Sequence, residues 1–262
     1  MEMDSRTHLG IHRSPAGVSD WAACTTSPKG WLTYFVRFTG LGYGDKVADF
    51  IWPPTHRAPP DPETRWSNKL FNQQYRWFQT HFVHRNLVIH YATVSERTVP
   101  SLVARLQVYR PKGVAGYHSS LSLLANYMKR KGLTLNVKAV ISIAERMVNR
   151  KLLEEAFRCP VFDSFASREV GFLAHECQAH QGLHLNHLTH HFEFLKQNEQ
   201  VEPGEMGEII VTDFNNYAMP FIRYRLGDFG RYSTEKCSCG RNLPMLQQVD
   251  GRSVEFMKTP SG

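Results

Sequence analysis

Short apolar runs alternate with amphipathic stretches between residues 87 and 165, and this alternation limits the chain to one fold class. Short apolar runs predict buried strands, whereas apolar residues at every third or fourth position predict helices. The predicted elements are strands over residues 87–91, 113–117, 137–143 and 160–165 and helices over 99–109, 121–130 and 149–157. Strands that are separated by helices pair in parallel through right-handed crossovers. We therefore expect an α/β fold, a layered parallel sheet with flanking helices, that binds ligands at the carboxyl ends of its strands.

The segments on either side of this region have other patterns. The elements predicted before residue 87 are helices within 14–43 and 66–82, a strand from Lys46 and a proline-rich loop over 53–62. From Leu183 onward the helical spacing disappears, and short alternating runs with glycine turns predict a β-rich end. We therefore expect an α/β portion over residues 1–175 and a β-rich subdomain over residues 176–262.

The composition is that of an ordinary folded protein and limits the partners. With 42% hydrophobic and 21% charged residues, the chain is not expected to be disordered. Its net charge of +7 is spread along the chain and no nucleic-acid-reading motif accompanies it, so we expect no nucleic-acid partner. The first 15 residues are polar, and no apolar run is long enough to cross a bilayer. These features predict a cytoplasmic protein without a membrane partner.

The loop after the last predicted parallel strand collects several kinds of polar side chain. Asp163, Ser167, Arg168 and Glu169 lie there together with the aromatic Phe165. Such a set at a strand's carboxyl end can bind a nucleotide and a divalent cation. It can also be a polar turn with Glu169 as a solvated charge, and these residues alone favour the turn.

A second polar set lies near the C-terminus, on a predicted strand and the turn after it. Arg223 and Arg225 are alternate residues of this strand and are therefore expected to share a face, with Asp228 following them. These three residues are either part of a binding site or an ordinary surface ion pair with Asp228, which contributes little energy.

The five cysteines are an odd number and too few to predict a disulfide framework, which favours reduced thiols or metal ligation. Cys177 and His184 form one close pair and Cys237 and Cys239 another. Three thiolates and an imidazole suit a closed tetrahedral Zn²⁺ site with a structural role. Two unpaired thiols in a turn are an equal alternative on spacing alone. Cys24 and Cys159 are expected in the core.

The ordered series of motifs resembles the phenylacetate–coenzyme A ligase family of the adenylate-forming superfamily. The motifs, in chain order, are FDSFASREVG, AHEC, GLHLN, GEMGEIIVTDFNNYAMPFIRYRLGDFG, CSCGRNLP and VDGRS. The resemblance implies ATP-dependent activation of a carboxylic acid, typically an aryl acid, to an acyl-adenylate and its transfer to coenzyme A. It also implies ATP or AMP, Mg²⁺, coenzyme A and a structural Zn²⁺ as ligands, with a small-molecule acid as substrate.

The resemblance assigns a role to each matching residue. Phe165 would stack on adenine with Asp163 at the adenine edge, Ser167 and Arg168 would face the phosphates, and Glu169 would hold Mg²⁺. Arg168 and Glu169 are the residues expected to act in catalysis. Asp228 would bind both ribose hydroxyls.

Further assignments follow from the same resemblance. Arg252 would contact the ribose or a phosphate. The walls of the acyl pocket would include Tyr117, Ser142 and Ala144. The four Zn²⁺ ligands would be Cys177, His184, Cys237 and Cys239. The remaining histidines of this region, His187, His190 and His191, are expected on the solvated surface because no acidic or cysteine ligand accompanies them.

The chain also departs from the family pattern at both ends. The glycine-rich phosphate loop is not recognisable, and residues 24–30 predict a turn. The chain stops at Gly262, after Arg252 and before the family's small lid domain with its catalytic lysine. We therefore expect a chain truncated at both ends. An incomplete enzyme that only binds nucleotide, or a zinc-stabilised scaffold, is the alternative function, and homodimerisation stays open.

Overall fold

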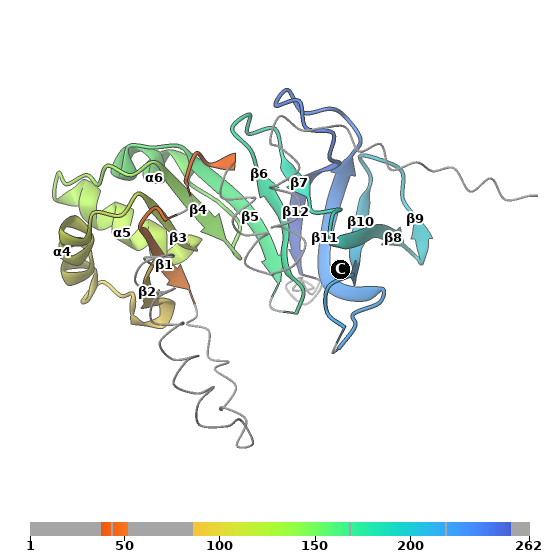
Figure 1. Cartoon of the computed structure of the whole chain (residues 1–262), viewed down its shortest axis with the longest axis horizontal. Coiled ribbons are helices and arrows are strands. Elements are labelled where there is room, and N and C mark those ends of the chain that lie inside the picture. Colours follow the sequence, from red (N-terminus) through yellow and green to blue (C-terminus); the bar gives the residue numbers. More distant parts are fainter. Residues whose placement is uncertain (1–37, 43, 52–85, 168, 218, 253–262) are drawn as a thin grey trace, which may run out of the picture.

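The computed structural model describes residues 38–42, 44–51, 86–167, 169–217 and 219–252 (Figure 1). The helices predicted within residues 14–43 and 66–82 and the proline-rich loop lie wholly or largely outside these residues, as do Arg168 and Cys24. One sheet runs through the described chain, with three helices on its α/β half (Figure 1).

Twelve strands form the sheet, in the order β2-β1-β3-β4-β5-β6-β7-β12-β11-β10-β8-β9. The strands of the α/β half are β1 (Val47–Ile51), β2 (Asn86–His90), β3 (Gly113–Tyr117), β4 (Ala139–Ile143) and β5 (Val161–Ser167). The strands of the other half are β6 (Gly171–Glu176), β7 (Leu183–Leu185), β8 (His190–Lys196), β9 (Glu199–Gln200), β10 (Met206–Asp213), β11 (Tyr224–Ser233) and β12 (Met245–Arg252). The first five strands are parallel, and every pairing from β5–β6 onward is antiparallel. The predicted α/β fold with a β-rich end is confirmed.

The three described α-helices lie where the periodicity predicts them. They are α4 (Val99–Tyr109), α5 (His118–Arg130) and α6 (Arg150–Phe157). The bounds of α4 agree with the prediction, but α5 begins three residues earlier than expected. The Glu145 carboxylate, which lies in the turn after β4, accepts hydrogen bonds from the Ser119 N–H and hydroxyl at the first turn of α5 and stabilises this earlier start.

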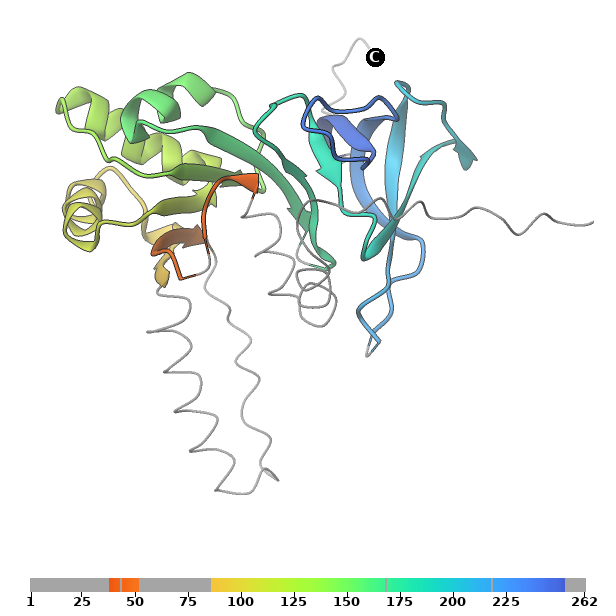
Figure 2. The ribbon, with the colours of Figure 1, turned by 45° about the horizontal axis from the view of Figure 1, so that its top comes forward.

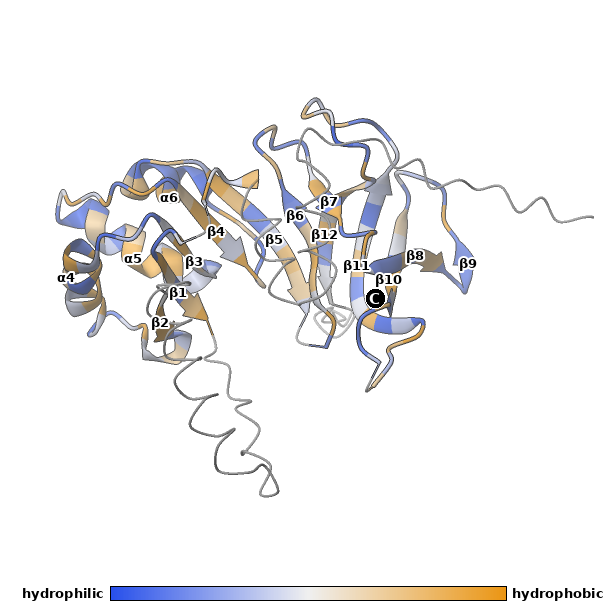
Figure 3. Cartoon of the chain, in the orientation of Figure 1, coloured by the Kyte–Doolittle hydropathy of each residue, from blue (hydrophilic) through white to orange (hydrophobic). Residues whose placement is uncertain are grey.

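Two apolar layers enclose the parallel strands. The helices contribute Leu106, Leu121, Leu124, Leu153 and Phe157 to one buried cluster with residues of β1, β3, β4 and β5. Figure 2 shows the helices along one side of the α/β half, and Figure 3 shows apolar residues along its strands. Each of these side chains is fully buried and contributes roughly 1.5 to 3 kcal/mol to folding. A smaller cluster lies on the opposite face of β3, β4 and β5.

The β-rich half has its own apolar core. This cluster joins residues of β6, β7, β8, β10 and β12, and Phe165 of β5 and Leu226 of β11 pack against it. Phe165 therefore connects the last parallel strand to the core of the β-rich half.

Candidate functional site

The carboxyl ends of β3, β4 and β5 bring together residues that are distant in the sequence. Ser142 of β4 is the register partner of Asp163 of β5, and Tyr117 of β3 is the register partner of Ile143. A residue expected in the acyl pocket and one expected at the adenine edge therefore lie side by side. This juxtaposition follows from the parallel pairing, which aligns the carboxyl ends of neighbouring strands.

The histidine at the start of α5 contacts the end of β4 and the segment that follows it. His118, the first residue of α5, is buried, and its Nδ1 lies 3.4 Å from the hydroxyl of the fully buried Ser142. The Val148 N–H donates to Nε2 of the same ring at 3.3 Å. Ala144, which follows β4, has a φ of 67°, a left-handed conformation that a residue with a Cβ rarely adopts. The turn after β4 is thus held in an unusual backbone conformation beside the expected acyl pocket.

Asp163 lies in a network of charged groups on the neighbouring elements. Its N–H donates to the Glu176 carboxylate at 3.0 Å, and Arg150 and His180 contact the same carboxylate at 2.9 and 3.1 Å. Burial raises the pKa of the Asp163 carboxyl to about 6, and Glu176 adds to this rise, whereas the Ser164 N–H and Arg150 oppose it. Asp163 is therefore a carboxyl group that titrates near neutral pH.

We expect an Asp163→Asn variant to be more stable than the wild type at pH 7.5, by on the order of 2 to 3 kcal/mol. The pKa of about 6 in the folded chain exceeds the ordinary value of 3.8, so the folded state binds more protons between these two pH values. Wild-type stability therefore falls as the pH rises through this window, and the neutral amide removes the loss. Urea unfolding at pH 4.5, 6 and 7.5 measures the difference. A gain that is equal at all three pH values, or no gain, would contradict this assignment.

The turn between β5 and β6 carries the residues expected at the phosphates. The Ser167 hydroxyl accepts a hydrogen bond from the Val170 N–H at 3.3 Å, and Glu169 is exposed at the turn. An exposed carboxylate at a strand end fits the ligand set of Mg²⁺, which takes one or two carboxylates together with phosphate oxygens.

Asp228 is buried on β11, where it is the register partner of Arg252 on β12. β6, β7 and β12 lie between β11 and the strand that carries Phe165. Phe165 and Leu226, two residues before Asp228, pack against one apolar cluster. Only the backbone of Arg252 is described. The common nucleotide site of Phe165 and Asp228 stays a prediction.

The two arginines before Asp228 have other partners than the surface ion-pair interpretation assumed. Arg223 pairs with Glu193 at 3.1 Å, and Arg225 pairs with Glu208. Glu193 lies on β8 and Glu208 on β10. Because Asp228 is buried, the interpretation of a surface ion pair with it was wrong. The predicted strand also differs, because Arg223 precedes β11 and Asp228 lies within it.

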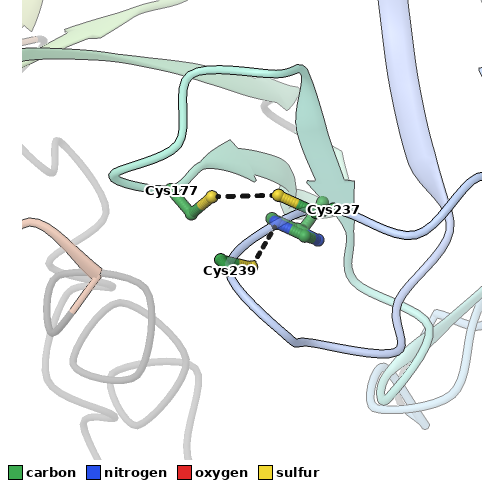
Figure 4. Close-up of side chains that lie close together, drawn as sticks. Cys177, Cys237 and Cys239 are labelled. Carbon is green, nitrogen blue, oxygen red and sulfur yellow. Dashed lines mark hydrogen bonds between the residues drawn. The ribbon is translucent and has the colours of Figure 1, made fainter.

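The structure gathers the four expected metal ligands at one point (Figure 4). The ligand atoms of Cys177, His184, Cys237 and Cys239 all lie within 4.8 Å of one another. The sulfurs of Cys177 and Cys237 are 3.6 Å apart, and the Cys239 sulfur lies 3.4 Å from Nε2 of His184. All three cysteines are free, with no disulfide between them.

Two distances in this cluster, between the Cys177 and Cys237 sulfurs and between the Cys239 sulfur and Nε2 of His184, are close to those of a tetrahedral Zn²⁺ site. Zn–S bonds of about 2.3 Å and Zn–N bonds of about 2.0 to 2.1 Å place two sulfurs about 3.8 Å apart, and a sulfur and a nitrogen about 3.6 Å apart. Burial and the nearby Arg241 lower the pKa of His184, which keeps its imidazole neutral and able to bind a metal. Phe38 and Met245 surround the cluster with apolar contacts.

The structure also shows buried polar residues that the sequence reasoning missed. Glu176, His175 and His190 are each at most 4% exposed. The expectation of a solvated surface was wrong for His190 and only partly met by His187, which is half-buried against Phe192, whereas His191 is exposed. Cys159 packs against the α/β core as expected. A buried position cannot be recognised from a charged or histidine residue itself, because the same residue types dominate solvated strands.

The fold is that of the adenylate-forming ligases. The crystal structure of 2-hydroxyisobutyryl-CoA ligase, in an open conformation with 2-HIB-AMP and CoA, matches with a TM-score of 0.68 at 20% identity. The match covers 93% of this chain and 51% of that chain. At this identity the match establishes the fold. No protein-family model matches the chain.

Two curated relatives confirm the resemblance seen in the motifs. Protein CapK of Staphylococcus aureus is 29% identical over 162 residues, which are 60% of this chain and 35% of the relative. The phenylacetate–coenzyme A ligase of Thermus thermophilus is 24% identical over 165 residues, which are 59% of this chain and 37% of the relative. The matched region therefore spans little more than a third of either relative. Within the described ranges, no helix combines the length and apolarity that a membrane crossing requires.

Proposed function

We propose that this chain carries the nucleotide- and acid-binding portion of an AMP-forming acid–coenzyme A ligase. The observation that carries the proposal is the position of the motif residues Asp163, Phe165, Ser167 and Glu169 on β5 and the turn after it. Carboxyl ends of parallel strands are where such sheets bind ligands. The sequence similarity to a phenylacetate–coenzyme A ligase supports an aryl acid as the substrate.

In this proposal each residue has a defined task in adenylation. The substrate carboxylate attacks the α-phosphorus of ATP, releasing pyrophosphate and forming an acyl-adenylate, and the coenzyme A thiol then displaces AMP. Phe165 stacks on adenine beside Asp163, and Asp228 accepts hydrogen bonds from the ribose hydroxyls. Arg252 contacts the ribose or a phosphate.

The remaining residues bind the reacting groups. Ser167 and Arg168 contact the phosphates. Glu169 holds Mg²⁺, which supplies charge neutralisation at the phosphates when bound. Tyr117, Ser142 and Ala144 line the acid's pocket, and the contact of His118 with Ser142 fixes that wall.

We further propose that Cys177, His184, Cys237 and Cys239 hold a structural Zn²⁺ ion. Four protein ligands fill a tetrahedral site and leave no position for a substrate. The ligands come from two segments, one around β7 and the other before β12. The metal therefore stabilises the antiparallel pairing of β7 with β12.

The alternative function is nucleotide binding without turnover, or a zinc-stabilised scaffold. Pyrophosphate release separates these functions from the ligase. We expect release that depends on ATP, Mg²⁺ and an aryl acid such as phenylacetate, and that falls by at least tenfold in a Glu169→Gln variant. Glu199→Gln removes an exposed carboxylate on β9 and serves as the control. AMP binding without acid-dependent pyrophosphate release would favour the alternative.

A further inference from the structure

A buried polar network lies directly beneath the turn between β5 and β6. Its members are Asn186, Thr189 and His190, which are 1%, 3% and 4% exposed, and the backbone of Val170. The amide nitrogen of Asn186 lies 2.7 Å from the Thr189 hydroxyl, this hydroxyl lies 2.9 Å from Nδ1 of His190, and Nε2 of His190 lies 2.9 Å from the Val170 carbonyl oxygen. The contacts form one chain from the loop after β7 to the turn.

The hydrogen-bond pattern assigns the donor at each step. The Val170 carbonyl oxygen can only accept, so Nε2 of His190 carries a proton and donates it. In the neutral ring Nδ1 is then the acceptor for the Thr189 hydroxyl, whose oxygen accepts from the Asn186 amide. Burial lowers the pKa of His190, although Asp213, 3.8 Å from Nε2, opposes this shift. The neutral ring is the form in which Nδ1 accepts the Thr189 hydroxyl hydrogen while Nε2 donates to Val170.

This network contacts the turn at Val170 and the first residues of β6 that follow it. The Asn186 amide also donates to the Phe172 carbonyl at 3.2 Å, and the Asn186 N–H donates to the Leu173 carbonyl at 2.8 Å. Within the turn, the Val170 N–H donates to the hydroxyl of Ser167, the last residue of β5. Val170 directly follows Glu169 in the chain. Its hydrogen bonds to Ser167 and His190 therefore restrict the backbone next to the Glu169 side chain.

We propose that His190 is a positioning residue that sets the direction of the Glu169 carboxylate toward a phosphate-bound Mg²⁺ ion. The inference rests on the proposed function and adds to it a residue outside the sequence motifs. A buried polar network costs more free energy to form than an apolar core of the same size. When its hydrogen bonds are satisfied it fixes the geometry of the backbone that it contacts, here the turn at Val170.

Calorimetric titrations with Mg·ATP and with AMP alone test this role. In a His190→Leu variant we expect Mg·ATP binding to weaken by on the order of ten- to a hundredfold, the usual effect of losing a group that orients a metal ligand. AMP binding, which involves Phe165 and Asp228, should stay within about twofold of the wild type. His190→Gln, whose amide can donate to the Val170 carbonyl, should recover part of the loss. His191→Leu, at the exposed neighbouring position, is the matched control.

The outcomes separate this inference from the proposed function. A wild-type chain that binds neither ligand contradicts both. The positioning role alone is overturned if the wild-type chain binds both ligands and the His190→Leu variant behaves in one of two ways. The variant either keeps the full wild-type affinity for Mg·ATP or loses affinity for Mg·ATP and AMP equally. If His190→Leu does not fold, Thr189→Val tests the same network, because it removes the hydroxyl at nearly unchanged volume. This variant should weaken Mg·ATP binding and leave AMP binding unchanged, and equal effects on both would overturn the inference.

Discussion

Replacing Cys239 by serine is expected to release about one Zn²⁺ ion per chain and to lower the free energy of unfolding by several kcal/mol. Structural zinc sites bind their metal with about 10 to 16 kcal/mol at neutral pH, and part of this energy holds the folded state together. The four ligand atoms lie within 4.8 Å of one another and come from segments on both sides of the β7–β12 pairing. Loss of one thiolate should therefore loosen the β-rich half.

Metal analysis of protein purified without added metal measures the zinc content, and urea unfolding measures the stability. Cys159→Ser is the matched control, because this thiol packs beside the α/β core and belongs to another cluster. Its zinc content should equal that of the wild type. A wild-type chain that is folded and carries no metal would contradict the zinc proposal.

Replacing Asp228 by alanine is expected to weaken AMP binding by about ten- to a hundredfold. Charge-assisted hydrogen bonds to the ribose hydroxyls contribute on the order of 1.5 to 3 kcal/mol, which corresponds to this range. Asp228 is buried on β11, so its carboxylate has a fixed position before a ligand arrives. Calorimetry with AMP measures the change.

Two further variants make this result specific. Asp228→Asn keeps one acceptor oxygen and should show an intermediate affinity. Glu202→Ala, an exposed position between β9 and β10, should bind AMP like the wild type. Thermal unfolding checks that Asp228→Ala folds. An AMP affinity unchanged in a folded Asp228→Ala chain would refute the ribose contact.

The fold could be predicted well wherever local patterns determine it. α4 has the predicted bounds because Pro100 lies in its first turn and Arg110 ends it in a left-handed conformation. α5 begins earlier than predicted because Glu145, 26 residues away, binds its first turn. Local periodicity carries no information about such a contact. The continuity of the sheet across β5 and β6 was likewise not predictable from the strands themselves.

The candidate site shows the same division. The cysteine and histidine spacing left zinc ligation and free thiols equally favoured, and the folded chain brings the four side chains together. His190 and Glu176 were missed because their burial depends on neighbours from distant segments. His190 contacts Val170 across 20 residues, and Glu176 contacts Arg150 across 26. A histidine-rich strand predicts neither contact.

The order of strands in the sheet has a consequence for synthesis of the chain on the ribosome. β7 is paired with β6 on one side, but its other neighbour is β12, the last described strand. In a nascent chain one edge of β7 therefore stays unpaired until about 60 further residues have been synthesised. An unpaired strand edge can form hydrogen bonds with other chains and so promotes aggregation. Cys237 and Cys239 are synthesised shortly before β12. Metal binding by these residues would therefore bring β12 next to the unpaired edge of β7 as soon as β12 has left the ribosome.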